Sequence, residues 1–160
     1  MLVDFNTLPE DSRIWIYQSN RKLTDEEVQE IEQAVADFLQ KWATHGKDLH
    51  ASFVTKYNRF IIIAVDQAIQ NVSGCSIDAS VTFIQELEQK YQIDLLDKMN
   101  VTFKLGEHIA HKPLIEFKQM AKQKAVSENT IVFNNLVNTI GEWKDFWEVP
   151  AKDSWHSRFF

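Results

Sequence analysis

The sequence predicts an α+β fold of the ferredoxin-like type, with the element order βαββαβ, one antiparallel sheet and two helices on one face of it. Two observations indicate this fold. The hydrophobic pattern gives strand, helix, strand, strand, helix and strand through residue 105. The two middle strands follow each other directly, whereas a doubly wound parallel sheet needs a helix after each strand. Residues 107–160 then indicate a mainly helical extension, which we expect to pack on the core or on a partner.

Length and composition predict a single domain. With 160 residues, 44% of them hydrophobic and 25% charged, the chain resembles an ordinary globular protein. We expect one domain over 1–160, with a lead-in at 1–12, the βαββαβ core at 13–106 and the extension at 107–160. The net charge of −6 disfavours nucleic acid and anionic membranes as partners. A single cysteine, no signal-peptide pattern and no long apolar run predict a cytoplasmic protein.

The first strand and the first helix have clear local signals. Residues 13–18 are rich in β-branched and aromatic side chains, which favours a strand. Thr24 and Glu27 form a capping-box pattern, so a helix is expected to begin there. Gly46 is the predicted end of this helix, because glycine accepts the left-handed conformation that often follows a helix. The predicted buried stripe consists of Val28, Ile31, Val35, Phe38 and Trp42.

The second part of the core begins with a hairpin. Residues 51–57 and 60–65 are predicted strands, and only Asn58 and Arg59 separate them. The second strand is apolar on both faces, which is typical of a central strand that is covered on both sides. A helix is then expected to begin with Ser76 as its N-cap. Residues 99–105 alternate between apolar and polar side chains, which predicts a strand with one solvent-exposed face.

The best candidate for a functional site is the junction between the apolar strand and the second helix, which contains the only cysteine, Cys75. The N-terminal turn of a helix presents N–H groups and partial positive charge, which favour anions and the thiolate form of cysteine. Backbone amides and serine hydroxyls here are therefore predicted to hold a carboxylate or a phosphate group. The predicted ligand-binding residues are Ser73, Gly74, Cys75, Ser76 and Ile77.

A rival hypothesis makes the same junction a catalytic site. In a thiol-dependent enzyme Cys75 would be the nucleophile, and His50, His108 or His111 would be its base. Metal binding is weakly indicated, because His108 and His111 are three residues apart and would share a metal only on a helix. No cysteine pair and no His-Glu-x-x-His motif is present. The sequence therefore predicts no metal site and no cofactor.

The last eighteen residues hold three of the five tryptophans. Trp143 and Trp147 are one helical turn apart and can present one large apolar face. We expect these rings either to cover the open face of the sheet or to contact a partner or a second copy of the chain. The predicted interaction surface consists of Trp143, Trp147, Trp155, Phe159 and Phe160.

Four segments resemble a family of short uncharacterised bacterial proteins: WIYQSNR (15–21), SGCSID (73–78), FNNLV (133–137) and SWH (154–156). The resemblance extends over nearly the full length of the chain. Members of this family often carry the label "ABC transporter ATPase". A P-loop needs Gly-x-x-x-x-Gly-Lys-Ser/Thr to hold nucleotide phosphates and magnesium. The only Gly-Lys pair, Gly46 and Lys47, lacks the first glycine and is followed by Asp48, so ATP hydrolysis by that mechanism is excluded.

The sequence therefore favours a small cytoplasmic module without chemistry of its own. We expect it to bind a small anionic ligand or a protein partner, and a homodimer is one arrangement that would satisfy the second expectation. The alternatives are the thiol-dependent enzyme and a structural subunit whose aromatic tail docks on another chain.

Overall fold

The computed structural model describes residues 1–68 and 71–160 and shows a mixed α/β chain with antiparallel sheets. The chain divides into two compact units. Unit 1 consists of residues 1–96 and 138–140, and unit 2 consists of residues 97–137 and 141–160. Within the described ranges, no helix is both long and apolar enough to cross a membrane.

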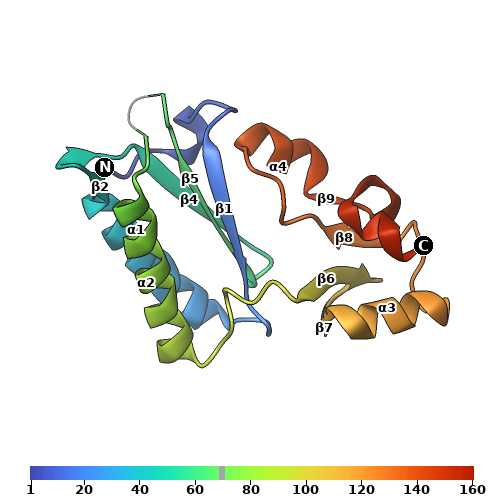
Figure 1. Cartoon of the computed structure of the whole chain (residues 1–160). Coiled ribbons are helices and arrows are strands. Elements are labelled where there is room, and N and C mark those ends of the chain that lie inside the picture. The colour runs from blue at the N-terminus through green and yellow to red at the C-terminus, as the bar shows by residue number, and fades with distance from the viewer. Residues whose placement is uncertain (69–70) are drawn as a thin grey trace. The chain divides into compact units, whose positions relative to one another are not determined.

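Unit 1 packs two helices on a three-stranded antiparallel sheet of order β1-β5-β4, and Figure 1 shows both helices on the same side of that sheet. Ile61, Ile63 and Val65 of the central strand point into the core that the helices cover. Its elements are β1 (Arg13–Gln18), α1 (Asp25–Lys41), β2 (Ala43–Thr44), β3 (Lys47–Asp48), β4 (Ala51–Lys56), β5 (Phe60–Val65) and α2 (Gly74–Tyr91), with a short 3-10 helix at Phe5–Thr7.

The central position predicted for the apolar strand is confirmed. β5 lies between β1 and β4, and all six of its residues are buried. The capping box predicted at the start of α1 is also confirmed, because the Thr24 hydroxyl accepts from the Glu27 N–H at 3.1 Å and the Glu27 carboxylate accepts from the Thr24 N–H at 3.0 Å. These two features depend on local sequence, and the local sequence is unambiguous at both.

Three boundaries in unit 1 differ from prediction. α1 ends at Lys41 rather than at Gly46, which instead forms the turn of the β2–β3 hairpin with a φ of 77°. The hairpin between β4 and β5 has three residues outside the strands instead of two, and Tyr57 and Asn58 have left-handed φ values of 57° and 52°. The N-cap of α2 is Ser73 and not Ser76, so the helix begins three residues earlier than expected.

The ferredoxin-like sheet is not found in the described residues, because the predicted fourth strand pairs elsewhere. This segment forms β6 (Asn100–Leu105) in unit 2, where β7 (His108–Pro113) and β8 (Ile131–Phe133) pair with its two edges. The edge of β1 that would receive a fourth strand is instead bonded by the segment 138–140. The Ile14 N–H donates to Asn138 O at 2.9 Å, and the Ile140 N–H donates to Ser12 O at 3.1 Å.

Unit 2 is built on a four-stranded antiparallel sheet of order β7-β6-β8-β9. The extension therefore contains strands that the sequence analysis missed as well as the helices that it expected. Pro113 is the last residue of one of these strands and the N-cap of the helix that follows it. The further elements are β7 (His108–Pro113), α3 (Leu114–Lys122), β8 (Ile131–Phe133), α4 (Ile140–Phe146), β9 (Glu148–Pro150) and two 3-10 helices, Ala151–Asp153 and Trp155–Phe159.

Candidate functional site

The N-terminal turn of α2 is held by the β2 segment that precedes it in the chain. Ser76 is buried and donates its hydroxyl to Ala43 O at 2.6 Å, while the Trp42 indole N–H donates to Ser76 O at 2.8 Å. The Ser73 N–H donates to the Thr44 hydroxyl at 3.1 Å. These three bonds tie the turn to residues 42–44.

The predicted anion-binding groups are only partly available in this turn. Ser73 Oγ accepts from the Ser76 N–H at 3.1 Å and lies 2.9 Å from the Ser76 hydroxyl. The Ile77 N–H donates to Ser73 O at 3.0 Å as the first bond of the helix. The N–H groups of Gly74 and Cys75 have no partner among residues 1–68 and 71–160. Both residues are exposed, and these two amides are what the turn offers to a ligand.

Cys75 is an exposed thiol in the first turn of α2. In the part of the chain that the structure describes, its sulfur has no hydrogen bond to a histidine. The His50 carbonyl accepts from the Asp66 N–H at 3.0 Å, so this proposed base lies beside the C-terminal end of β5, from which the chain continues towards α2. A residue that the sequence analysis did not consider, His45, directly follows Thr44, whose hydroxyl bonds Ser73. The signal that could have found it is the Thr-His-Gly turn.

His108 and His111 do not form the pair that a metal site requires. Both lie on β7, a strand, so a separation of three residues points their side chains to opposite faces. His111 Nδ1 instead lies 3.0 Å from the hydroxyl of Thr102 on β6. No cluster of three metal-ligating side chains occurs among the residues that the structure describes.

The aromatic tail packs largely within unit 2. The Trp147 ring is buried, its indole N–H donates to Asn135 Oδ1 at 2.9 Å, and its centre lies 5.7 Å from that of Trp143. Phe159 packs on Phe117 with ring centres 5.7 Å apart. The predicted interaction surface is therefore mainly packed against its own unit. The more exposed apolar side chains of unit 2 are Met99, Leu105, Ile115, Leu136, Phe146 and Phe160.

A serine–histidine pair lies in the same region, and the sequence analysis did not identify it. Ser154 Oγ is 2.6 Å from Nδ1 of His156, which is 1% exposed and stacks on Trp155 at 3.8 Å. Burial, with a smaller effect of the nearby Arg158 charge, lowers the pKa of His156 from 6.5 to about 4. The imidazole is therefore neutral at physiological pH and forms part of the unit 2 core.

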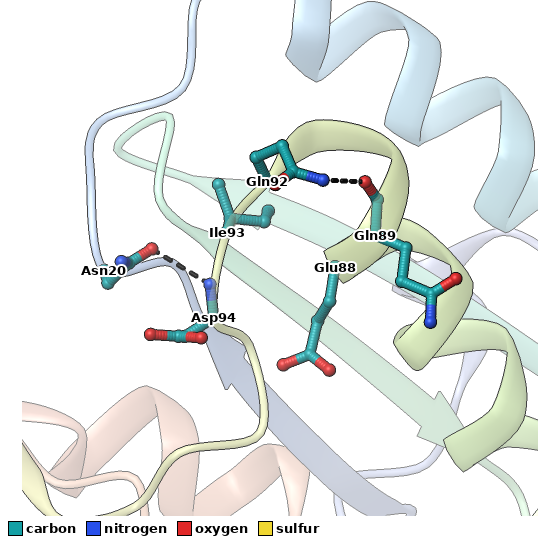
Figure 2. Close-up of a pocket in the computed structure, with 6 residues that line it drawn as sticks. All are labelled: Asn20, Glu88, Gln89, Gln92, Ile93 and Asp94. Atoms are coloured by element: carbon teal, nitrogen blue, oxygen red, sulfur yellow. Dashed lines mark hydrogen bonds between the residues drawn. The ribbon is translucent and has the colours of Figure 1, made fainter.

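A polar pocket of about 430 Å³ opens at the C-terminal end of α2 (Figure 2). The Asp94 N–H donates to Asn20 Oδ1 at 3.0 Å, which closes one wall. The Glu88 carboxylate accepts from the N–H groups of Leu95 and Leu96, at 2.8 and 3.1 Å. Its lining residues are Asn20, Glu88, Gln89, Gln92, Ile93 and Asp94. Because these come from two distant segments, no sequence motif marks the pocket.

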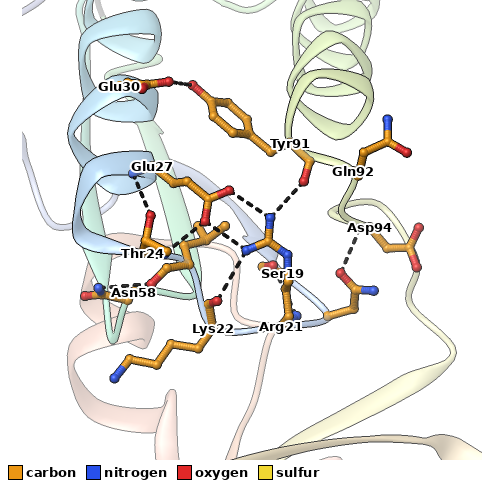
Figure 3. Close-up of polar contacts among 12 residues, drawn as sticks. Ser19, Arg21, Lys22, Thr24, Glu27, Glu30, Asn58, Tyr91, Gln92 and Asp94 are labelled. Atoms are coloured by element: carbon orange, nitrogen blue, oxygen red, sulfur yellow. Dashed lines mark hydrogen bonds and ion pairs between the residues drawn. The ribbon is translucent and has the colours of Figure 1, made fainter.

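Beside this pocket, Arg21 joins three segments of unit 1, as Figure 3 shows. Its guanidinium makes two hydrogen bonds to the Glu27 carboxylate, at 2.9 and 2.8 Å, and one to Tyr91 O at 2.8 Å. The Tyr91 hydroxyl donates to Glu30 at 2.9 Å. The Arg21 hydrogen bond, with the Thr24 N–H bond, lowers the pKa of Glu27 from 4.5 to about 2. Every charge in this cluster has a partner, which indicates a structural role.

No family model, curated protein or solved structure matches the chain. The resemblance to the family of short bacterial proteins stays a prediction. Gly46 and Lys47 lie in the hairpin between β2 and β3 rather than between a strand and a helix, so they do not occupy the position of a P-loop.

Proposed function

We propose that the protein is a binding module for a small anionic ligand, and that the ligand is held at the N-terminal turn of α2. The observation that carries this proposal is the exposed pair of N–H groups on Gly74 and Cys75, at the positive end of a helix of 18 residues. A Cβ atom built on Gly74 would meet no atom within 4 Å, so an alanine side chain fits at this position. A carboxylate or phosphate oxygen is the group that two such amides would bind.

The test removes one of these N–H groups without removing the helix. Gly74 is the first residue of α2, where proline is well tolerated, and Ser73 already has the extended conformation (φ −75°, ψ 162°) that a following proline requires. Gly74→Pro therefore deletes one donor, and Gly74→Ala is the matched control because it keeps the N–H.

Binding of inorganic phosphate and of acetate would be followed through the amide signals of Gly74 and Cys75 in ¹⁵N–¹H spectra. We expect both signals to move in the wild type, Gly74→Ala to bind equally, and Gly74→Pro to bind at least about fivefold more weakly, since one charge-assisted hydrogen bond contributes about 1 kcal/mol or more. Equal affinity of the proline and alanine variants would refute the proposal. So would the absence of any response at these two amides.

A second candidate, a thiol-dependent enzyme, is favoured by one observation: the contact between Ser73 and Thr44 brings His45 to the segment next to the N-terminal turn of α2. In this hypothesis the base would be His45 or His50. The rate of Cys75 alkylation by iodoacetamide would be measured from about pH 5 to pH 10, in the wild type and in His45→Gln and His50→Gln. Rapid alkylation at pH values well below the ordinary thiol pKa of about 8.5 would support catalysis, if replacing one of the two histidines abolishes it. An ordinary profile in all three proteins would end it.

A further inference from the structure

The pocket at the C-terminal end of α2 contains carboxylate oxygens that the protein does not use (Figure 2). The Glu88 carboxylate accepts from the N–H groups of Leu95 and Leu96 on Oε2 alone, so its Oε1 has no partner among residues 1–68 and 71–160. In the same ranges, neither oxygen of the exposed Asp94 carboxylate has a hydrogen bond or an ion pair. The pocket therefore offers acceptors from two carboxylates.

An amide side chain adds a further acceptor to this pocket. Gln92 donates its Nε2 to Gln89 O at 2.7 Å, which uses a donor of this amide and leaves its Oε1 without a partner in the part of the chain that the structure describes. Asn20 is the exception, because its Oδ1 already accepts from the Asp94 N–H. Most of the unused oxygen atoms of the lining are therefore acceptors, and a ligand that fits them must donate.

The charge of the pocket favours a cation as well. Of its six lining residues two are acidic and none is basic. The two basic residues next to them in the sequence are engaged: Arg21 makes two hydrogen bonds to the Glu27 carboxylate, and Lys90 Nζ lies 5.4 Å from the centre of the Tyr91 ring. The C-terminal end of a helix of 18 residues adds partial negative charge at the same place.

We infer that this pocket is a second ligand site, which takes the ammonium or guanidinium group of a small organic cation. Both groups carry a positive charge and donate hydrogen bonds without accepting any, so they match the unused oxygens. The volume of about 430 Å³ is in the range of small-molecule sites, about 300–1,000 Å³. A metal ion fits less well, because no group of three metal-ligating side chains occurs among the described residues.

This site is independent of the one proposed at the start of α2. It lies at the opposite end of the same helix and takes a ligand of the opposite charge. At about 1.5 Å per residue, the length of α2 separates the two sites by roughly 25 Å.

The experiment follows the backbone amide signals of residues 92–94 in ¹⁵N–¹H spectra, at constant ionic strength. The probes are butylamine and methylguanidine, which are cations at neutral pH, and methylurea, which has nearly the shape of methylguanidine but no charge. We expect both cations to shift these signals in a saturable way and methylurea to leave them unchanged.

Two variants remove one charge each from the pocket and keep an acceptor oxygen: Asp94→Asn and Glu88→Gln. The matched control is Asp11→Asn, at an exposed carboxylate that precedes β1, whereas Asn20 follows the other end of that strand. We expect both pocket variants to bind the cations at least about fivefold more weakly than the wild type, and the control to bind them equally. Asp94 has no side-chain partner to lose, so Asp94→Asn carries the test if Glu88→Gln does not fold.

Equal affinity of Asp94→Asn and Asp11→Asn would overturn the inference, because the attraction would then belong to the acidic surface in general. Methylurea binding as tight as that of methylguanidine would overturn it too. So would signals that respond to calcium chloride but to neither organic cation. Gly74→Pro lacks a donor of the α2 start and should bind both cations like the wild type, so failure of the anion site leaves this result standing.

Discussion

The buried imidazole of His156 makes a sharp prediction about acid stability. In the folded protein its pKa is lowered from 6.5 to about 4, chiefly by burial, whereas the unfolded chain keeps the ordinary value. Between these two values the unfolded state binds a proton that the folded state does not bind. The contribution of the neutral His156 to the free energy of unfolding is therefore fully present above pH 6.5, and it is lost as the pH is lowered from 6.5 towards 4.

The size of the effect follows from the same two values. At about 1.4 kcal/mol per pKa unit, the difference between 6.5 and about 4 gives a loss of about 3 kcal/mol at pH 4. About 2 kcal/mol of this should already be lost at about pH 5, above the range in which Glu27 becomes protonated. For a chain of this size, that is a large share of the total stability.

The assay is urea unfolding at a series of pH values between about 7 and 4, followed by tryptophan fluorescence, to which Trp155 contributes from its stacked position on His156. The matched variant is His156→Gln, which keeps a polar side chain beside Ser154 but does not titrate. We expect the variant to be less stable at pH 7 and to have a much flatter pH dependence. Parallel pH profiles of the two proteins would refute the reasoning, because the acid-sensitive group would then be another one.

Three further predictions concern packing and charge. Glu27→Gln should lower the free energy of unfolding by up to about 1 kcal/mol, because it breaks the ion pair with Arg21 but keeps the helix cap. Glu27→Ala also removes the cap and should lower it by about 1 kcal/mol more. Equal unfolding midpoints of the two variants in urea would contradict this. Burial and the neighbouring carboxylate of Glu30 raise the pKa of Tyr91 from 10 to about 12, so folding stability should fall as the pH rises from about 10 to about 12. Tyr91→Phe should make this fall smaller. An unchanged pH dependence of stability in this range would count against the prediction. Phe117→Ala should lower the free energy of unfolding by about 3–5 kcal/mol, because the ring is fully buried. Ile115→Ala, at an exposed position of the same helix, should change it by no more than about 0.5 kcal/mol. Similar thermal midpoints of the two variants would show that Phe117 is not a core residue of unit 2.

Local sequence patterns predicted the elements of unit 1 well, and non-local pairing is where prediction failed. The Thr24–Glu27 cap and the apolar strand 60–65 depend on residues a few positions apart, so their signals are complete in the sequence. The pairing of residues 99–105 depends on which strand edges are free in the folded chain. That choice was decided by residues 108–113 and 131–133, which pair with this strand, and by 138–140, which bond to the edge of β1.

In the candidate sites too, local features could be predicted from the sequence and non-local contacts could not. The start of α2 was located from a serine-rich turn after a strand, but Ser73 and Ser76 both fit the N-cap pattern. Only the contacts of Ser76 with β2 decide that Ser73 is the cap and that Ser76 is buried. The pocket at the C-terminal end of α2 has no motif at all, because its lining residues come from two distant segments of the sequence, which only the folded chain brings together.

The position of Arg21 has a consequence for how unit 1 opens. Its bonds tie the first turn of α1 and the last turn of α2 to the loop that follows β1. None of these three segments can detach without breaking a bond to the same guanidinium. Their backbone amides are therefore expected to exchange with solvent deuterium in one cooperative step, at a common rate that rises together when the arginine is replaced.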